Sequence, residues 1–419
     1  MKKNLAEWLA YIERQHPSTI ALGLERVSQI MQTLNLALGC PVITVGGTNG
    51  KGSTCAMLES ILRCAGYRTG LYTSPHLVRY AERVRIAGLE CEEDTLCDGF
   101  AAVEAARGET PLTYFEFGTL AAFWIFRQAK IEAAVLEVGL GGRLDAVNVV
   151  DADCAVLTSV GIDHVDYLGP DRESIGREKA GIFRPGRPAV VADPEPPSSV
   201  VSATGDKLFL GKDFGFQAQE TQWSYWGPGG KRGGLAWPAL RGRIQLRNAA
   251  AALCALDTLR ERLPVAAQDV RRGLAEVAIP ARFQVLPGRP QVVLDVAHNP
   301  QAAQTLADNL GAAGFSPETI AVCGMLRDKD IAGTLRALAP RVTRWHVATL
   351  PGPRGASADL LGDHLRGLGA SAAEKFASVE DALEAALGRA TPDDKIVVFG
   401  SFLTVGEAMQ WLTNKTSKR

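Results

Sequence analysis

The segment VITVGGTNGKGST, residues 42–54, constrains this 419-residue chain more than any other part of its sequence. The β-branched run 42–45 is typical of a buried strand, and apolar residues recur at helical spacing over 57–62. Between them lie glycines, Lys51 and two hydroxyls, an arrangement that cradles nucleotide phosphates with backbone N–H groups and a helix N-terminus. The segment therefore predicts a strand–loop–helix unit that binds ATP.

The loop departs from the standard phosphate-binding spacing. That spacing puts its first glycine at position 45, which is valine here, and Gly52 separates Lys51 from the hydroxyl of Ser53. The alternative is a glycine turn that only joins a strand to a helix, but such a turn has no use for a lysine. We therefore expect a variant phosphate loop in which Lys51 reaches the β- and γ-phosphates and a hydroxyl faces Mg²⁺.

Composition limits the class of protein. The chain is 46% hydrophobic and 22% charged, as ordinary globular proteins are, and its length favours two domains. A net charge of −1 offers no electrostatic footprint for nucleic acid, and no apolar run is long enough for a membrane span. Eight cysteines without a CxxC pair, and an amphipathic start over 1–15 in place of a signal peptide, predict a cytoplasmic protein with reduced thiols. We expect a monomer.

Strand-like runs alternate with helical patterns, which predicts an α/β fold with a mainly parallel sheet. We expect a P-loop sheet domain over 1–284, followed by a smaller Rossmann-like α/β domain over 285–419. The stretch 194–234, rich in Pro, Gly, Ser and Trp, is expected to form a meander of short strands and loops on the main sheet, and the tail 414–419 to be disordered. The expected strands are 42–46, 69–72, 133–138, 154–159, 189–192, 292–296, 320–323, 344–348 and 396–399. The expected helices are 53–65, 115–128, 247–262, 267–277, 301–310, 331–338, 357–368 and 378–387.

Polar side chains follow successive strands of the first domain. Ser74 follows one strand, Glu137 lies at the end of the next, and His164 follows a third. Because ligands of open α/β sheets gather at the carboxyl ends of the strands, Glu137 is a candidate Mg²⁺ ligand there. Each residue alone has an ordinary alternative, a loop carboxylate or a hydrogen-bonded structural histidine. At successive strand ends they indicate a site.

Two further stretches carry candidate chemistry. Lys179 precedes an apolar pair in REKAGIFRPG, where a surface lysine with a buried stem is the ordinary interpretation and a lysine of depressed pKa is the alternative. In DVAHNP, Asp295 and His298 end a strand of the second domain, and Asn299 caps the next helix. Taken alone, DVAHNP indicates only the capped N-terminus of a helix and no binding site.

Six motifs, in this order and at these separations, resemble the folylpolyglutamate synthase branch of the Mur ligases. They are GTNGKGS, TSPHLVRYAERVRI, LEVGLGGRLDAVN, GIDHVDYLG, REKAGIFRPG and DVAHNP. The stretches ALGLERV and LTYFEFGTL are similar to those of the bacterial members that also make dihydrofolate. The resemblance extends from about residue 22 to the early 400s.

The resemblance implies roles for the nucleotide-binding and metal-binding residues. Residues of the loop would hold ATP phosphates, and residues of both domains would contact the rest of the nucleotide, so that the domains must close together. Ser74, Glu137 and His164 would ligate Mg²⁺ at two sites. Lys179 would carry a carbamate, as N6-carboxylysine, and act in catalysis with Lys51 and His164. The implied nucleotide-binding residues are Thr48, Asn49, Gly50, Lys51, Gly52, Ser53, Asn248, Arg282 and Asp295.

The resemblance also implies a pterin site and shows two departures from the family. Val296 stands where the family commonly has glycine, and Ile244 stands where it commonly has histidine. The second departure weakens any expected contact at position 244. The implied pterin-binding residues are Ala21, Leu22, Gly23, Leu24, Thr113, Tyr114, Phe115, Glu116, Leu144, Asp145 and Ala146.

The implied reaction is ATP-dependent addition of L-glutamate to dihydropteroate and to reduced folates through an acyl phosphate. A single-function enzyme that only lengthens folates is one alternative. A nucleotide-hydrolysing switch is another, but it would not need Lys179 or the pterin segments. A ligase for UDP-linked peptides is disfavoured, because it is expected to need a further domain ahead of the loop.

Overall fold

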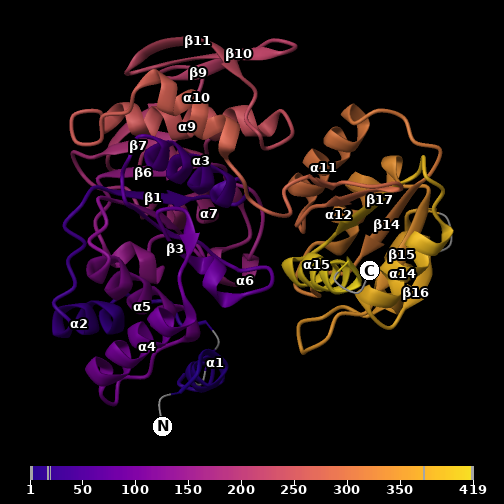
Figure 1. Cartoon of the computed structure of the whole chain (residues 1–419), viewed down its shortest axis with the longest axis horizontal. Helices are drawn as coiled ribbons and strands as arrows, with labels where there is room; N and C mark the ends of the chain where they lie inside the picture. The colour runs from indigo at the N-terminus through magenta and orange to yellow at the C-terminus, as the bar shows by residue number, and fades with distance from the viewer. Residues whose placement is uncertain (1–2, 17, 19, 371–372, 417–419) are drawn as a thin grey trace. The chain divides into compact units, whose positions relative to one another are not determined.

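The computed structural model describes residues 3–16, 18, 20–370 and 373–416 (Figure 1). Contacts group the chain into two compact units. The first comprises Met1–Ala239 and Gln245–Ala278, and the second comprises Leu240–Ile244 and Ile279–Arg419. The strand and helix pattern of the sequence predicted a P-loop sheet domain over 1–284 and a smaller α/β domain over 285–419.

The first unit is built on an eight-stranded sheet in the order β4-β3-β2-β5-β1-β6-β7-β8. From β2 to β8 every neighbouring pair is parallel, whereas β3 and β4 add antiparallel strands at one edge. The mainly parallel sheet is therefore confirmed. Its strands are β1 (Val42–Gly46), β2 (Thr69–Tyr72), β3 (Val84–Ile86), β4 (Leu89–Glu90), β5 (Ala133–Glu137), β6 (Cys154–Leu157), β7 (Pro188–Val191) and β8 (Asp206–Phe209).

Helices cover the sheet and bury its apolar faces. The largest cluster of buried side chains in this unit includes Phe100 of α4, Phe117 and Phe123 of α5, and Leu136 of β5. Burial of this apolar surface fixes the strands whose ends carry the candidate site. The helices are α1 (Leu5–Ile12), α2 (Glu25–Thr33), α3 (Lys51–Cys64), α4 (Glu93–Arg107), α5 (Tyr114–Gln128), α6 (Val165–Leu168), α7 (Arg172–Ala180), α8 (Ser198–Val201), α9 (Ile244–Thr258) and α10 (Ala267–Glu276), with 3-10 turns η1 (Tyr80–Arg83) and η2 (Ala146–Val149).

The predicted meander of short strands over 194–234 is confirmed, but most of it does not lie on the main sheet. Only β8 joins the main sheet; β9 (Gly215–Ala218), β10 (Gln222–Gly227) and β11 (Gly230–Ala236) form a separate antiparallel sheet. A short turn lets β10 and β11 pair with each other, and buried Asp257 of α9 anchors both strands. Its carboxylate accepts bonds from the Tyr225 hydroxyl at 2.6 Å and from Arg232 at 2.6 Å.

The second unit has a six-stranded sheet in the order β12-β13-β17-β14-β15-β16, in which only β12 is antiparallel. This confirms a smaller Rossmann-like α/β unit. Its strands are β12 (Gln284–Leu286), β13 (Gln291–Leu294), β14 (Thr319–Cys323), β15 (Arg344–Ala348), β16 (Glu374–Phe376) and β17 (Lys395–Phe399). Its helices are α11 (Pro300–Ala312), α12 (Ile331–Leu338), α13 (Ala358–Gly367), α14 (Val379–Arg389) and α15 (Phe402–Thr416), with the turn η3 (Ala339–Arg341). Because α15 includes 414–416, the predicted disorder is wrong there; 417–419 lie outside the described residues.

Two expectations from composition can be compared with the structure. All eight cysteines are free thiols, six of them buried, which agrees with the expected reduced state. Burial raises the pKa of Cys154 to about 12, so that this thiol is held in its unreactive protonated form. Within the described residues, no helix combines the length and the apolar character that crossing a membrane requires.

Candidate active site

The order of the strands gathers the chemistry of the first unit at one edge of its sheet. Four neighbours, β2, β5, β1 and β6, are parallel, so their carboxyl ends lie side by side. Ser74 follows β2, Glu137 ends β5, the phosphate loop follows β1, and His164 lies on the segment after β6. The backbone N–H of Ser74 donates to the Glu137 carboxylate at 3.2 Å. The structure therefore brings these predicted residues to the same strand ends.

The phosphate loop is held from outside by the residues that follow β6. The N–H of Thr48 donates to the carbonyl of Ser159 at 2.8 Å, and the N–H of Asn49 donates to the Ser159 hydroxyl at 3.0 Å. The Thr158 hydroxyl donates to the carbonyl of Asn49 at 2.7 Å. Sequence reasoning missed Thr158 and Ser159, because nothing local in the sequence connects them with the loop. They fix its backbone before any ligand arrives.

Lys51 begins α3 and folds back over the loop. Its Nζ donates to the carbonyl of Gly47 at 3.0 Å and to that of Thr48 at 3.3 Å. Gly52 and Ser53 are buried in the first turn of the helix, where N–H groups have no intrahelical acceptor. A cation and free N–H groups at a helix N-terminus are the features that bind phosphate oxygens.

Replacing Gly50 with alanine is expected to weaken ATP binding by about tenfold or more. Gly50 has φ of 91°, and an added Cβ would lie 2.7 Å from Oδ1 of Asn248, which is buried on α9. The loop or Asn248 must therefore move. Gly66→Ala is the matched control, since Gly66 has φ of 93° with nothing within 4 Å of its added Cβ. The Kd for ATP of each variant is measured by calorimetric titration. Equal Kd values for Gly50→Ala and Gly66→Ala would contradict the expectation.

Lys179 is buried at the centre of this site. It lies on α7 with 5% of its surface exposed, and its Nζ donates to the carbonyl of Gly47 at 3.0 Å. Lys51 uses the same carbonyl. Burial, with help from the nearby charge of Lys51, lowers the pKa of Lys179 to about 7, although Asp163 and Asp145 oppose the shift. The interpretation as a surface lysine is therefore wrong, and the amine is largely neutral under mildly alkaline conditions.

Glu137 and His164 offer the ligand types that the sequence suggested for a metal. Glu137 is buried at the end of β5, and His164 adopts a left-handed φ of 53° just before α6. The N–H of His164 donates to the Asp163 carboxylate at 2.8 Å. No three His, Cys, Asp or Glu side chains lie together as a ready metal cluster within the described part of the chain. A hard divalent ion here would need hydroxyl, phosphate or water oxygens to complete its shell.

The three segments with implied pterin contacts lie together. The N–H of Gly23, in the 21–24 loop before α2, donates to the carbonyl of Leu144 at 3.4 Å. Phe115, in the first turn of α5, packs so closely on Gly139 that an added Cβ there would lie 2.7 Å from its ring. Asp145 is buried, which raises its pKa to about 6, and its carboxylate accepts from two backbone N–H groups. Thr113 and Ala146 are also buried at this place.

Two rings and one arginine border these segments, and of these the sequence assigned no role to Tyr80 or Arg83. The rings of Tyr80 and Tyr114 lie 5.9 Å apart, and the Arg83 guanidinium carbon lies 5.5 Å from the Tyr114 ring centroid. Nε of Arg83 donates to Nδ1 of His76 at 2.8 Å. Burial and the charge of Arg83 lower the pKa of His76 to about 4, so this histidine is a neutral acceptor. The residues lie in TSPHLVRYAERVRI, but their approach to Tyr114 is long-range.

The remaining predicted residues belong to the second unit. Asp295 follows β13, and its carboxylate accepts from the N–H groups of Phe283 and Ala297, each at 2.8 Å. Burial raises the pKa of Asp295, whereas the charge of Arg282 lowers it. The Arg282 guanidinium carbon lies 5.3 Å from the ring centroid of Phe402, and the His298 ring lies 6.2 Å from it. These side chains form their own cluster at the carboxyl end of β13.

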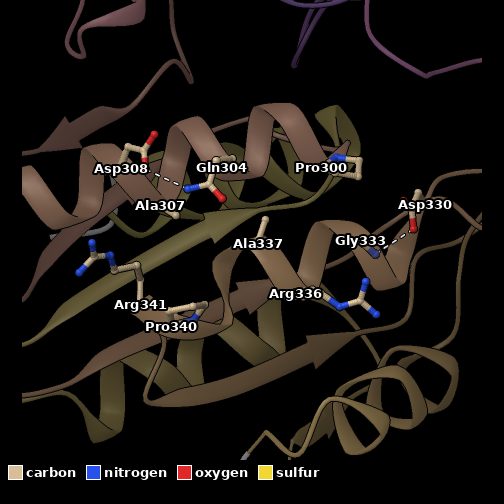
Figure 2. A pocket seen from close by; sticks show the side chains of 10 residues that line it. All are labelled: Pro300, Gln304, Ala307, Asp308, Asp330, Gly333, Arg336, Ala337, Pro340 and Arg341. Atoms are coloured by element: carbon tan, nitrogen blue, oxygen red, sulfur yellow. Dashed lines mark hydrogen bonds between the residues drawn. The ribbon is translucent and has the colours of Figure 1, made fainter. Parts of the chain in front are cut away.

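A separate groove lies between α11 and α12 of the second unit (Figure 2). Gln304 and Asp308 are hydrogen-bonded along α11, and Asp330 caps α12 through the N–H of Gly333 at 2.8 Å. None of the site residues predicted from the sequence lines this groove. The lining residues are Pro300, Gln304, Ala307, Asp308, Asp330, Gly333, Arg336, Ala337, Pro340 and Arg341.

Comparison with known proteins gives a consistent result. The Mur ligase middle domain matches residues 45–256, and the Mur ligase glutamate ligase domain matches residues 281–402. The dihydrofolate synthase/folylpolyglutamate synthase of Escherichia coli (strain K12) is 48% identical over 99% of this chain and 96% of that protein. The protein of that name from Haemophilus influenzae is 41% identical over 96% of each.

Solved structures agree over nearly the whole chain. E. coli FolC in complex with DHPP and ADP superposes with a TM-score of 0.93 at 47% identity, covering 99% of both chains. A bifunctional folylpolyglutamate synthase/dihydrofolate synthase with Mn, AMPPNP and L-glutamate bound superposes with a TM-score of 0.91 at 46% identity, covering 98% of both.

Proposed function

Because this chain belongs to the Mur ligase family, in its dihydrofolate synthase/folylpolyglutamate synthase branch, we propose that it adds L-glutamate to 7,8-dihydropteroate and to tetrahydrofolate polyglutamates. It is an ATP-dependent acid–amino-acid ligase of folate biosynthesis. The observation that carries the proposal is the convergence of Lys51, Glu137 and Lys179 around one phosphate loop in a chain that matches these relatives along its whole length.

The chemistry explains why such a loop is needed. A carboxylate is a poor electrophile for two reasons. Resonance lowers the electrophilicity of its carbon, and its negative charge repels an attacking amine. Transfer of the γ-phosphoryl group of ATP gives an acyl phosphate, which the amine of glutamate attacks with release of phosphate. Lys51, already placed over the loop by two carbonyls, would neutralise charge on the moving phosphoryl group. The bonds from the N–H groups of Thr48 and Asn49 to Ser159 would keep the backbone of the loop in place during phosphoryl transfer.

The donor set suits a divalent ion, for which Mg²⁺ and ATP are the proposed cofactor and co-substrate. Buried Glu137 would supply an oxygen ligand, and Ser74, whose backbone N–H bonds Glu137, would supply a hydroxyl. His164, on the segment after β6, would supply an imidazole from the other side of β1. When bound there, the ion would neutralise phosphate charge and orient the reacting oxygens. We assign these three residues to two Mg²⁺ sites, with His164 as a ligand and not as a base.

We further assign Lys179 as an N6-carboxylysine. A neutral amine attacks the carbon of CO₂ and then loses one proton to solvent, which leaves an anionic carbamate, and the lowered pKa of Lys179 supplies that neutral amine. The product would replace one of two cations that share the Gly47 carbonyl with an anion that attracts Lys51. The modification therefore relieves repulsion inside a buried site.

The remaining assignments are proposals of the same kind. We assign residues 48–53, Asn248, Arg282 and Asp295 to the nucleotide, and residues 21–24, 113–116 and 144–146 to the pterin. We propose an ATP-binding domain over 1–284 and a glutamate ligase domain over 285–419. We also propose a cytoplasmic monomer with small-molecule substrates and neither a nucleic acid nor a membrane partner.

The proposed function is tested by ADP release with ATP, Mg²⁺ and L-glutamate, with and without dihydropteroate. We expect release only with dihydropteroate present and a mass gain of one glutamyl unit in the pterin product. The same assay with tetrahydrofolate tests elongation. Turnover with tetrahydrofolate alone would indicate a single-function enzyme. ADP release that ignores both pterins would instead support the nucleotide switch.

A further inference from the structure

Arg26, on α2, joins two of the segments assigned to the pterin. Its Nη2 donates to the carbonyl of Ala21 at 2.9 Å and to Oε1 of Glu116 at 2.7 Å, and its Nε donates to the same oxygen at 3.1 Å. One guanidinium therefore holds both the 21–24 loop and the first turn of α5. Arg26 lies in the stretch ALGLERV, but the sequence alone assigned it no role.

Glu116 and Thr113 form the capping box that begins α5. Its Oε2 accepts from the N–H of Thr113 at 2.8 Å, and the Thr113 hydroxyl accepts from the N–H of Glu116 at 3.2 Å. The Glu116 side chain is only 4% exposed, against 27% for that of Arg26. A buried carboxylate without its cation is strongly unfavourable, so the pair is held in one geometry.

Two contacts of the 21–24 loop can be compared within the described part of the chain. Leu24, which precedes α2, makes no side-chain capping bond, and Leu22 is 36% exposed. The N–H of Gly23 reaches the carbonyl of Leu144 at 3.4 Å, which is a long hydrogen bond. The bond from Arg26 to the carbonyl of Ala21, at 2.9 Å, is the shorter of these two anchors.

We propose that Arg26 is a positioning residue that sets the width of the pterin pocket, and this inference rests on the pterin assignment made above. Its fork fixes the 21–24 loop against the first turn of α5, which carries Phe115, so that a flat bicyclic ring fits between them. Removing the Arg26 guanidinium releases the 21–24 loop, which forms one wall of the pocket. The phosphate loop keeps its own hydrogen bonds to Thr158 and Ser159. Arg26 thus acts on the acceptor and leaves ATP and glutamate binding unchanged.

The experiment compares Arg26→Met and Arg26→Lys with the wild type in full-length protein. We expect both variants to raise KM for dihydropteroate by about tenfold, a loss of about 1.4 kcal/mol, with KM for ATP and for glutamate unchanged within about twofold. Lysine keeps the charge beside Glu116 but lacks the planar fork, so Arg26→Lys should keep the wild-type Tm and still bind dihydropteroate weakly. Titration of dihydropteroate alone by calorimetry gives a readout that does not depend on turnover.

Arg344→Met is the matched control, because Arg344 forms a two-bond pair with Glu318 in the second unit, at 2.7 and 2.8 Å. It should leave all three KM values unchanged. A wild-type enzyme that ignores dihydropteroate would contradict the proposed function. A wild-type enzyme that uses it, with Arg26 variants that bind it normally or lose all three substrates equally, would overturn the role of Arg26 only.

Discussion

Replacing Lys51 with methionine is expected to lower kcat for ADP release by on the order of a thousandfold or more. Methionine keeps much of the apolar stem but removes the cation that lies over the carbonyls of Gly47 and Thr48. The transferred phosphoryl group then loses its nearest protein charge, and that loss grows as charge develops in the transition state. Steady-state ADP release with dihydropteroate, glutamate and saturating ATP measures the effect.

The control for Lys51 is Lys231→Met, since Lys231 is exposed on β11. It should retain wild-type turnover. The fold of the Lys51 variant should also survive, because the loop keeps its bonds to Ser159. Circular dichroism and thermal melting check this. A folded Lys51→Met enzyme with near-normal kcat would remove the lysine from the mechanism.

Replacing Lys179 with alanine is expected to lower kcat by on the order of a hundredfold to a thousandfold. If the working group is a carbamate, a small carboxylate such as acetate should restore part of the activity of the alanine variant by entering the vacated space. An arginine at this position keeps a cation but cannot form the carbamate, so Lys179→Arg should be as inactive as Lys179→Ala. Normal turnover of Lys179→Arg would refute the assignment.

The pKa of Lys179 also predicts dependence on pH. With a pKa of about 7, roughly nine-tenths of the amine is neutral at pH 8 and roughly one-tenth at pH 6. Activity of enzyme depleted of CO₂ should therefore return faster at pH 8 than at pH 6 when both samples are equilibrated with the same partial pressure of CO₂. In the folded state the pKa is depressed from 10.5, so between pH 7 and 10.5 only the unfolded chain binds this proton. The contribution of Lys179 to the free energy of unfolding should rise with pH across that window.

Local patterns predicted the elements that carry their own signal. The strand of β1 and the start of the phosphate loop follow from β-branched residues that end in glycines, and the polar residues Ser74, Glu137 and His164 were recognised because each follows an apolar run. The sheet then explains why they matter together, since their strands β2, β5 and β6 lie within one run of four adjacent parallel strands that also includes β1. Helix bounds were less accurate: α3 begins at Lys51 and not at 53, because the left-handed Gly50 lets the helix start directly after the loop.

The residues that sequence reasoning missed act over long separations. Ser159 holds the phosphate loop and Arg26 holds Glu116, but no spacing rule connects either pair. The short edge strands β3 and β4 were missed because three and two residues give too little alternation to recognise. The burial of Lys179 could not be predicted for the same reason, because the carbonyl that its amine contacts belongs to Gly47, in the loop after β1.

The strand order also has a consequence for how the chain acquires its activity during synthesis. Val45 of β1 pairs with Glu137 of β5, and Gly46 pairs with Leu157 of β6. The partners of β1 are thus made roughly a hundred residues after it, which is a high contact order for the central strand. A nascent chain therefore carries the complete phosphate-loop motif long before the loop has its supports. Nucleotide binding can therefore stabilise the fold only after β6 has been made, and until then the apolar strand β1 lacks its partner on that side.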